Sequence, residues 1–379
     1  MKAPVTIVHL IAGLGFGGAE RQLQYLVTRS DPKQFSHIVI SMTDKGELGP
    51  ALEALGIEVH TLGMARGRIS IGGIFRLRAL LTSLDAAILQ TWMYHAGLLG
   101  LVVGRSCKVP SILWNLRCSN MNLSDYGRLT GLVVKLCAKF SKLPNAAIVN
   151  SQAGQQWHEQ LSYHPRRWGL IYNGFDFERF VPNENAKHIL CDELGLAVDT
   201  PLVGLVARVD PMKGHDVFIK AANIVLQSNP NVHFVLVGKD VEQVQDDGLG
   251  RHLHRLGARS DVAILTAAFD FAVSASVYGE GFPNTVGEAM ACGVPCVVTD
   301  VGDSAYVVGN LGWVVKPRDP EALAISICKA LSLEIAEKNT LKTKNREHIV
   351  KYFGIENMVI TYGDFYTQEI ATVQNKESN

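Results

Sequence analysis

Two glutamates, Glu280 and Glu288, lie eight residues apart in the stretch G-E-G-F-P-N-T-V-G-E-A-M-A-C-G-V-P. Glycines on both sides of Glu280 let the backbone approach a ligand closely, and residues 283–290 are typical of the opening of a helix. Eight residues make about two helical turns, so both carboxylates can point along one face. The start of a helix offers unpaired N–H groups to an anion. Carboxylates beside an anion site predict a ligand that carries both hydroxyl and phosphate groups, such as a sugar nucleotide.

The same stretch resembles the donor-site signature of the family 4 retaining glycosyltransferases, which have the GT-B fold. The resemblance implies that Glu288 binds the ribose hydroxyls and Glu280 the sugar hydroxyls of a donor, most simply a UDP-sugar. It further implies a reaction with retention of anomeric configuration, without metal or other cofactor, because the nucleotide sugar is itself a substrate. The implied donor contacts also include Gly281, Phe282, Pro283 and Asn284. The alternative interpretation of the glutamates is two solvated residues on a helix.

A basic pair is formed by Arg208, near the end of a predicted strand over 202–209, and Lys213, just past it, in R-V-D-P-M-K-G-H-D. The resemblance implies that these cations neutralise the donor diphosphate, whose negative charge grows as the sugar bond breaks. They could otherwise be ordinary surface cations. Backbone around Ala258 and Arg259 is implied to face the base. The brief polar segment over 241–251 departs from the family, which usually places a helix there, and leaves that flank of the nucleotide pocket undefined.

The first strand, over 5–11, leads into a glycine-rich turn, G-L-G-F-G-G-A-E. Gly13, Gly15 and Gly18 fit the G-x-G-x-x-G of dinucleotide-binding domains, although Asp44, the acidic candidate, comes late. The G-G-A-E segment instead resembles the first glycine-rich loop of the family. Amides of Gly17 and Gly18 would then contact the donor's distal phosphate or the acceptor.

Three more residues follow predicted strand ends in the first half of the chain. His95 comes after a strand over 86–91, and the resemblance places a histidine here near the transferred sugar. Its alternative role is that of a structural histidine in a loop. Asn115 and Arg117 lie just past a strand over 112–115, where we expect acceptor or phosphate contacts.

A basic amphipathic helix is predicted over 124–142. Ser124 can cap it, and Arg128, Lys135, Lys139 and Lys142 form a basic face opposite an apolar stripe. Such a helix can lie on an anionic membrane surface. Arg66, Arg68, Arg76 and Arg78 add positive charge nearby in the sequence. The alternative is a helix docked on a sheet with a merely solvated charged face.

Composition supports a two-domain protein of a reducing cytoplasm. The chain has 379 residues, of which 47% are hydrophobic, enough for two cores. No apolar run reaches the ~18 residues of a spanning helix, and the start lacks the features of a signal peptide. The seven cysteines form no C-x-x-C and are expected to be buried thiols. Residues 1–180 hold 19 Lys and Arg against 11 Asp and Glu, so the first half is basic and is expected to face something anionic.

Alternation of short apolar strands with helical periods predicts parallel, helix-covered sheets. The resemblance implies the GT-B α/β architecture, two Rossmann-like, doubly wound parallel-sheet domains that face each other across a cleft. We expect an acceptor-side domain over 1–182, a nucleotide-sugar domain over 183–356 and a last helix over 357–372 that packs back on the first domain. The tail beyond 372 is expected to lack order.

The predicted function is transfer of a sugar to an acceptor, most simply a polyprenyl-linked saccharide used in cell-surface polysaccharide assembly at the inner face of the cell membrane. Two rival hypotheses are a sugar-nucleotide epimerase of the same architecture and a non-catalytic subunit that binds a sugar nucleotide. A metal-dependent enzyme is disfavoured because Asp176-x-Glu178 matches D-x-D imperfectly. No nucleic-acid-binding motif accompanies the basic charge.

Overall fold

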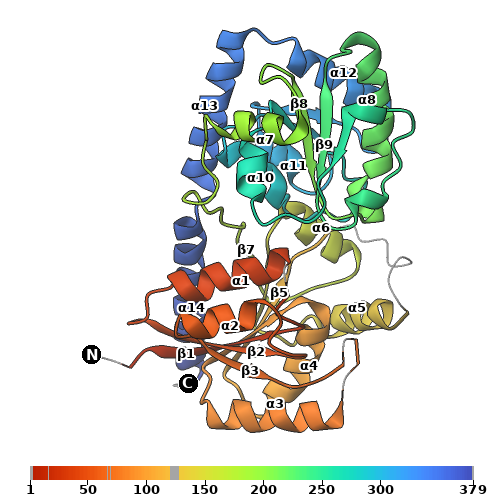
Figure 1. The fold of residues 1–379 in the computed structure, drawn as a ribbon. Helices are drawn as coiled ribbons and strands as arrows, with labels where there is room; N and C mark the ends of the chain where they lie inside the picture. The colour runs from red at the N-terminus through yellow and green to blue at the C-terminus, as the bar shows by residue number, and fades with distance from the viewer. Residues whose placement is uncertain (1–2, 16, 66, 69, 120–127, 378–379) are drawn as a thin grey trace. The chain divides into compact units, whose positions relative to one another are not determined.

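The computed structural model describes residues 3–15, 17–65, 67–68, 70–119 and 128–377, which form two compact units. The first comprises the chain up to Gly174 together with the segment from Ile355 onward, and the second is Phe175–Gly354. Each unit has one parallel sheet with helices on both faces (Figure 1). This confirms the predicted fold class of two parallel-sheet α/β domains. The predicted boundary between residues 182 and 183 follows the division at Gly174 and lies in the second unit.

The first sheet has the strand order β3-β2-β1-β4-β5-β6-β7, with all neighbours parallel. Its strands are β1 (Val5–Ile11), β2 (Phe35–Ser41), β3 (Glu58–Thr61), β4 (Ile88–Trp92), β5 (Ser111–Leu116), β6 (Ala146–Val149) and β7 (Trp168–Leu170). The helices of this unit are α1 (Gly18–Arg29), α2 (Leu48–Ala54), α3 (Ile71–Ser83), α4 (Met93–Ser106), α5 (Arg128–Phe140), α6 (Gln152–Gln160) and α14 (Ile355–Glu377). The strand order reverses direction between β1 and β4, which makes that place the topological switch point of the sheet.

Side-chain alternation along the strands builds one core on each face of the first sheet. Ile7 and Ile11 of β1 pack with residues of α1, α2 and α14. Val8 and Leu10 point to the other face and pack with residues of α3 and α4. Further along that second face, residues of α4 and α5 cover β5 and β6. Helices α3, α4 and α5 therefore share one layer.

The second sheet repeats the plan in the order β10-β9-β8-β11-β12-β13, again all parallel. Its strands are β8 (Leu202–Val206), β9 (His233–Val237), β10 (Leu253–Arg255), β11 (Phe271–Ser274), β12 (Cys296–Thr299) and β13 (Trp313–Val315). The α-helices are α7 (Ala186–Leu194), α8 (His215–Ser228), α9 (Val262–Ala267), α10 (Asn284–Ala291), α11 (Ser304–Val308), α12 (Pro320–Leu331) and α13 (Ile335–Tyr352). Three 3₁₀ turns complete it: η2 (Pro211–Lys213), η3 (Val241–Gln243) and η4 (Gly250–His252). The short η3 and η4 occupy the segment that departs from the family.

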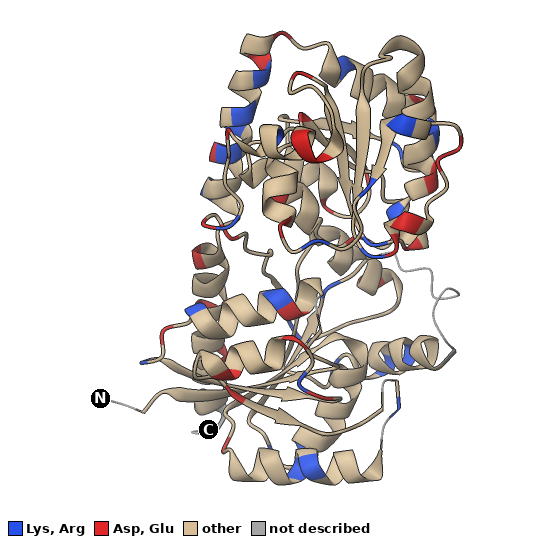
Figure 2. Ribbon diagram, viewed as in Figure 1, with Lys and Arg blue, Asp and Glu red and all other residues tan. Residues whose placement is uncertain are grey.

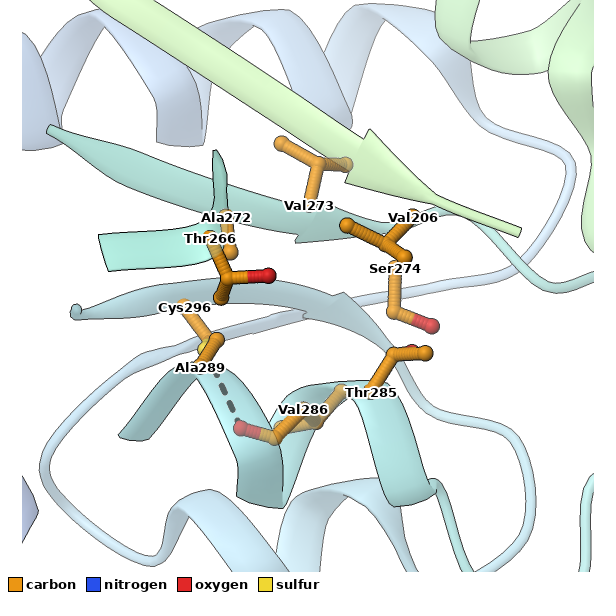
Figure 3. A pocket seen from close by; sticks show the side chains of 9 residues that line it. All are labelled: Val206, Thr266, Ala272, Val273, Ser274, Thr285, Val286, Ala289 and Cys296. Atoms are coloured by element: carbon orange, nitrogen blue, oxygen red, sulfur yellow. Dashed lines mark hydrogen bonds between the residues drawn. The ribbon is translucent and has the colours of Figure 1, made fainter. Parts of the chain in front are cut away.

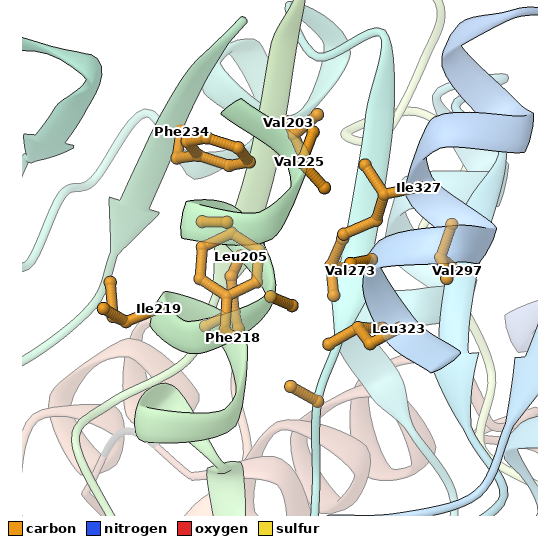
Figure 4. Packing of buried hydrophobic residues seen from close by; sticks show 14 of the residues in the cluster. Val203, Leu205, Phe218, Ile219, Val225, Phe234, Val273, Val297, Leu323 and Ile327 are labelled. Atoms are coloured by element: carbon orange, nitrogen blue, oxygen red, sulfur yellow. The ribbon is translucent and has the colours of Figure 1, made fainter. Parts of the chain in front are cut away.

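The core of the second unit lies between the sheet and the helices α8 and α12 (Figure 4). Phe218 of α8 meets Phe234 of β9 edge to face, with ring centroids 5.8 Å apart. Leu323 and Ile327 of α12 pack against the same sheet face and are fully buried. This core holds β8 and β11 rigidly, and their ends carry the residues considered below.

Helix α14 packs on the first unit through aromatic residues. Tyr362, Phe365 and Tyr366 join the core that covers β1 and β2. The Tyr366 hydroxyl donates to Gln90 Oε1, and Arg167 pairs with Glu369 at 2.7 Å. The helix continues to Glu377, so the expectation that the tail beyond 372 lacks order is wrong.

Predicted helix 124–142 corresponds to α5, which is described over Arg128–Phe140. Ser124 lies outside the described residues, as does Arg66. The expectation for the cysteines holds for five of the seven, which are buried, whereas Cys107 and Cys328 are only partly covered.

A glycine in the middle of β8 gives a test of this packing. A methyl group on Gly204 would lie 2.0 Å from Cε2 of the buried Phe269 ring. We expect Gly204→Ala to lower the free energy of unfolding by about 1–3 kcal/mol, the usual cost of overpacking a core. Urea denaturation followed by fluorescence measures the change.

The matched control is Gly72→Ala, because that glycine lies in α3 with open space around its Cα. Alanine is the better helix former by roughly 0.5–1 kcal/mol, so the control should keep or raise the denaturation midpoint. Equal midpoints for Gly204→Ala and the wild type would contradict the packing described for β8.

Candidate functional site

Lys213 and Glu280 meet at the switch point of the second sheet. Strands β8 and β11 are neighbours there, and the loops that leave their carboxyl ends carry these two residues. Lys213 Nζ forms an ion pair with Glu280 Oε1, and Ser276 Oγ donates to the same oxygen at 2.9 Å. The structure thus brings together two of the predicted site residues where open parallel sheets bind ligands.

Tight backbone contacts fix the loop that carries Lys213. Asp210 caps η2 by accepting a hydrogen bond from the Met212 amide at 3.1 Å, and the Val277 amide donates to Met212 O at 2.8 Å. Gly214 has φ +63°, and a Cβ there would lie 2.1 Å from Ala275 O. Only glycine fits this position, so the two loops can approach each other closely.

Arg208, the other member of the basic pair, is held loosely. Its side chain is 59% exposed and pairs with Asp210 at 2.8 Å. Exposed ion pairs contribute only about 0–1 kcal/mol. The guanidinium can therefore leave Asp210 for a phosphate at little cost.

Helix α10 begins directly after the Glu280 loop, with Pro283 as its N-cap and Asn284 as its first residue. Gly281, Phe282 and Pro283 are buried, and Gly281 O accepts from the Asp303 amide at 3.0 Å. The Phe282 ring stacks on Phe175, with centroids 5.8 Å apart. The loop is thus anchored on both sides.

Glu288 is half-buried on α10, one helix turn before its end. Burial first, and then the negative charge of Glu288, raise the pKa of Cys292 to about 12. That thiol therefore stays protonated at neutral pH.

Arg259, whose backbone is predicted to face the nucleotide base, donates hydrogen bonds to two carboxylates. Hydrogen bonds to Asp261 and then Glu193, at 2.7 and 2.6 Å, raise its pKa above its ordinary value. Ala258 is exposed and follows Gly257, which has φ +66°. The backbone contact with a base stays a prediction.

In the first unit, Gly17 is the N-cap of α1 and Gly18 its first residue. They follow β1 on one side of the switch point, and His95 follows β4 on the other. His95 lies in the first turn of α4 rather than in the loop that the alternative interpretation required. Burial lowers its pKa, so the imidazole is neutral at neutral pH.

Strand β4 runs into α4 without a connecting loop. The junction residue Met93 has φ +67°, which is rare for a residue with a side chain. Such strain persists where the surrounding structure imposes it, often at functional sites. It sets the direction in which the first turn, with His95, leaves the sheet.

Sequence reasoning missed Ser276, which lies three residues before the G-E-G-F-P stretch. The signal was present, because Ser276 precedes Glu280 by four residues and both follow one strand end. The imperfect D-x-D has another role: Asp176 Oδ1 accepts hydrogen bonds from the amides of Glu178 and Arg179 at 3.1 and 3.0 Å. Among the described residues no cluster of three or more His, Cys, Asp or Glu could hold a metal ion.

Two hollows of the second unit are poor candidates for a nucleotide. A cavity of about 10 Å³ lies between β8, β11, β12 and α10, with Ser274, Thr285 and Cys296 in its wall (Figure 3), and has room for about one water molecule. A hollow of about 360 Å³ opens near Pro201, Val232 and Asp270, at the amino ends of the strands. Parallel sheets bind ligands at their carboxyl ends, so the loops around Lys213 and Glu280 remain the candidate site.

Relatives with assigned activities align along most of the chain. One is the UDP-Gal:alpha-D-GlcNAc-diphosphoundecaprenol alpha-1,3-galactosyltransferase of Escherichia coli, 25% identical over 293 residues, with 74% of each chain covered. Another is the N,N'-diacetylbacillosaminyl-diphospho-undecaprenol alpha-1,3-N-acetylgalactosaminyltransferase of Campylobacter jejuni, 24% identical, with 80% of this chain and 84% of the relative covered.

Solved structures share the fold. HepE of Anabaena in complex with UDP superposes with a TM-score of 0.82 at 22% identity, covering 96% of this chain and all of that one. Sucrose-phosphate synthase of Thermosynechococcus elongatus superposes with a TM-score of 0.80 at 20% identity, covering 97% of this chain and 100% of that one. The fold is that of the GT-B glycosyltransferases.

Two family models match consecutive parts of the chain. Residues 16–179 match Glycosyltransferase Family 4, and residues 200–332 match Glycosyl transferases group 1. The first match contains Gly17, Gly18 and His95, and the second contains Arg208, Lys213 and both glutamates. The chain therefore belongs to the family 4 glycosyltransferases.

Proposed function

We propose that this glycosyltransferase moves a hexose-type sugar from a UDP-sugar to a saccharide linked to polyprenyl diphosphate, with retention of configuration and without a metal. The observation that carries the donor half is the cluster of Lys213, Glu280 and Ser276 at the switch point of the second sheet. The acceptor half is supported by the two bacterial relatives, whose names specify diphosphoundecaprenol-linked acceptors. The enzyme would take part in polysaccharide assembly. It would act in the cytoplasm, at the inner face of the membrane.

In the proposed complex four charged residues of the second unit have partners on the donor. Lys213 and Arg208 contact the diphosphate and stabilise the charge that develops on it as the sugar leaves. Glu280 accepts hydrogen bonds from sugar hydroxyls, and Glu288 from the ribose. A phosphate oxygen of the departing diphosphate helps to deprotonate the acceptor hydroxyl on the same face, which gives retention.

For the first unit we propose contacts with the transferred sugar or the acceptor. The amides of Gly17 and Gly18 are available at the start of α1, where the helix dipole favours an anion. His95 is neutral and can both donate and accept a hydrogen bond from hydroxyl groups.

The donor base and the role of Glu288 are tested by ligand-induced stabilisation. UDP, GDP, ADP and their common sugar conjugates are added without metal, and thermal unfolding is followed. We expect UDP compounds alone to stabilise the protein, by about 2.7 kcal/mol at 100 times the dissociation constant. Glu288→Gln should abolish the response because it removes the carboxylate that accepts from the ribose.

Glu356→Gln is the matched control, because this exposed glutamate lies in the first turn of α14 in the other unit. A response to GDP or ADP instead of UDP would contradict the proposed donor. An unchanged response in Glu288→Gln would contradict the role of that residue.

Lys213 is tested by turnover. We expect Lys213→Met to lower kcat by about 10²- to 10³-fold, the usual loss when one group that stabilises developing charge is removed. Lys220→Met is the control, because Lys220 is an exposed lysine on α8 in the same unit. Proton NMR of the first product formed gives its anomeric configuration.

Three outcomes of the turnover assay would overturn parts of the proposal. An inverted product would exclude retention, and full activity of Lys213→Met would exclude its role. Consumption of the UDP-sugar without any acceptor, with an isomeric UDP-sugar as product, would identify an epimerase. Donor binding without turnover would favour a non-catalytic subunit.

We further propose that the enzyme adsorbs to the membrane through the layer of α3, α4 and α5. The charged residues within these three helices are all basic: Arg76, Arg78, Arg105, Arg128, Lys135 and Lys139. Exposed apolar side chains lie among them: Ile71 and Phe75 of α3, Val102 of α4, and Leu129 and Leu132 of α5. Figure 2 shows the blue basic segments on α3 and α5. Basic charge with exposed apolar side chains suits the surface of an anionic bilayer.

None of the described helices is long and apolar enough to cross a bilayer. Binding through the α3–α5 layer would be reversible, since it rests on surface charge and a few apolar side chains. The opposite layer differs: α1, α2 and α14 contain acidic residues such as Glu20, Glu53 and Glu369.

The membrane proposal is tested by sedimentation with vesicles that contain phosphatidylglycerol. Each lysine near an anionic surface contributes about 1 kcal/mol, so Lys135→Gln with Lys139→Gln should weaken binding by roughly 30-fold. The control double variant is Lys329→Gln with Lys344→Gln, two exposed lysines of the second unit.

Binding should also fall at about 1 M salt, where the Debye length is about 3 Å. Equal binding of both double variants, or binding to neutral vesicles as strong as to anionic ones, would refute the proposed surface.

A further inference from the structure

Arg117 lies just past the carboxyl end of β5, beside the switch point of the first sheet. Its guanidinium contacts four side chains from separate parts of the first unit. Nη1 donates to Asn115 Oδ1 at 3.3 Å and to the Tyr362 hydroxyl at 3.2 Å, and Nη2 donates to Asn173 Oδ1. The fourth contact is the Trp92 ring, whose centroid lies 5.2 Å from Arg117 Cζ.

All four of these partners are neutral, so none of them is a counter-ion for the cation. Among the described residues no carboxylate pairs with Arg117; Glu20, in the first turn of α1, acts on it only at longer range. Burial lowers the pKa of the guanidinium, yet arginine stays charged in proteins. A partly buried charge without a counter-ion is costly, which leaves this position favourable for an anion.

The guanidinium has more N–H donors than the described residues accept from. It carries five N–H groups, and the described residues accept three hydrogen bonds from it. Two N–H groups therefore remain for a ligand, and the side chain is half-buried rather than sealed. A planar arginine with free donors suits the bidentate recognition of phosphate oxygens.

The surroundings hold the guanidinium in place before any ligand arrives. Asn115 Nδ2 donates to the Tyr362 hydroxyl at 2.8 Å, which fixes the amide that accepts from Arg117. Asn173 lies in a turn that Gln22 of α1 clamps, because the Gln22 side chain bonds both the N–H and the C=O of Gly174, at 2.9 and 3.0 Å. A preorganised cation binds an anion without the entropy loss of ordering a long side chain.

We propose that Arg117 is the subsite for the diphosphate of the acceptor. This inference rests on the proposed function, which supplies an acceptor with a polyprenyl diphosphate, and it names the group of the first unit that recognises it. The donor diphosphate already has its own basic pair, Arg208 and Lys213, in the second unit. Arg117 distinguishes acceptors that carry a phosphate from those that do not.

The test compares two acceptors that share one saccharide, the first linked to a short prenyl diphosphate and the second to a neutral octyl group. We expect Arg117→Gln to lower kcat/KM for the diphosphate acceptor by roughly 10- to 100-fold, the range for a hydrogen bond to a charged group. The value for the octyl acceptor and the KM of the donor should change little. Arg117→Lys keeps the charge but loses the planar fork of donors. Its kcat/KM for the diphosphate acceptor should lie between the values of Arg117→Gln and the wild type.

Arg29→Gln is the matched control, because Arg29 is an exposed arginine of α1 in the same unit, and it should keep the preference for the diphosphate acceptor. Equal losses with both acceptors would reduce Arg117 to a structural role and overturn the proposal. A loss confined to the KM of the donor would assign Arg117 to the donor phosphates instead.

A binding measurement separates this proposal from the proposed function. Calorimetry with a short prenyl diphosphate needs no turnover, and Arg117→Gln should weaken binding by the same 10- to 100-fold. If the wild type transfers sugar to neither acceptor, the proposed function fails, and the calorimetry still decides on Arg117. Equal affinity of the wild type and Arg117→Gln would overturn the subsite whatever the turnover assay gives.

Discussion

The contact between Lys213 and Glu280 is the interaction on which the donor side of the structure depends. Both side chains are largely buried, 19% and 11% exposed, so each would be costly without the other. Their pairing satisfies both charges while no ligand is bound, and Ser276 adds a hydrogen bond to the carboxylate. A sugar diphosphate offers each group a replacement, phosphate for the ammonium and hydroxyls for the carboxylate. In the proposed complex, donor binding would be an exchange of partners in which no buried charge is left unpaired. The exchange requires the loops after β8 and β11 to touch, which the bare backbone of Gly214 allows.

The parts of the structure that the sequence predicted are those encoded within a short stretch of chain. The two parallel-sheet domains follow from strand and helix periods, and β8 begins at Leu202, as predicted. The basic pair and the first glutamate follow β8 and β11 as expected, because glycines and a proline mark the turns around them. Prediction failed for segments of the chain in which the apolar periodicity is weak. Helix α13 has a polar sequence with little apolar periodicity and was not predicted, and α14 runs to Glu377 beyond the expected end of order. The direct passage from β4 into α4 through Met93 also has no local signal, since methionine rarely adopts a positive φ.

Contacts between distant segments could not be predicted at all. Arg117 was marked only by its place after a strand, whereas its surroundings come from β4, from the turn at Asn173 and from α14. Tyr362 lies 245 residues further along the chain than the arginine it contacts. Spacing in the sequence cannot encode such a pair, because it forms only when α14 packs on the first sheet. The same holds for Tyr366 and Gln90, another tyrosine–amide pair of that interface. The most informative feature of the first unit is thus a product of tertiary packing and not of any motif.

Two physically different sets stand out among the basic residues in the first half of the chain. One set belongs to α3, α4 and α5. Its described side chains are exposed, so solvent and salt screen their charges and only a surface with many negative charges attracts them strongly. The other is Arg117, which neutral groups surround and water screens less, so a single anion in contact would have a large effect. A polyprenyl diphosphate presents both features, since its chain stays in a bilayer and its diphosphate projects from the surface. A free, water-soluble acceptor would need only the second. The presence of both sets in one unit is therefore what favours a lipid-linked acceptor over a soluble one.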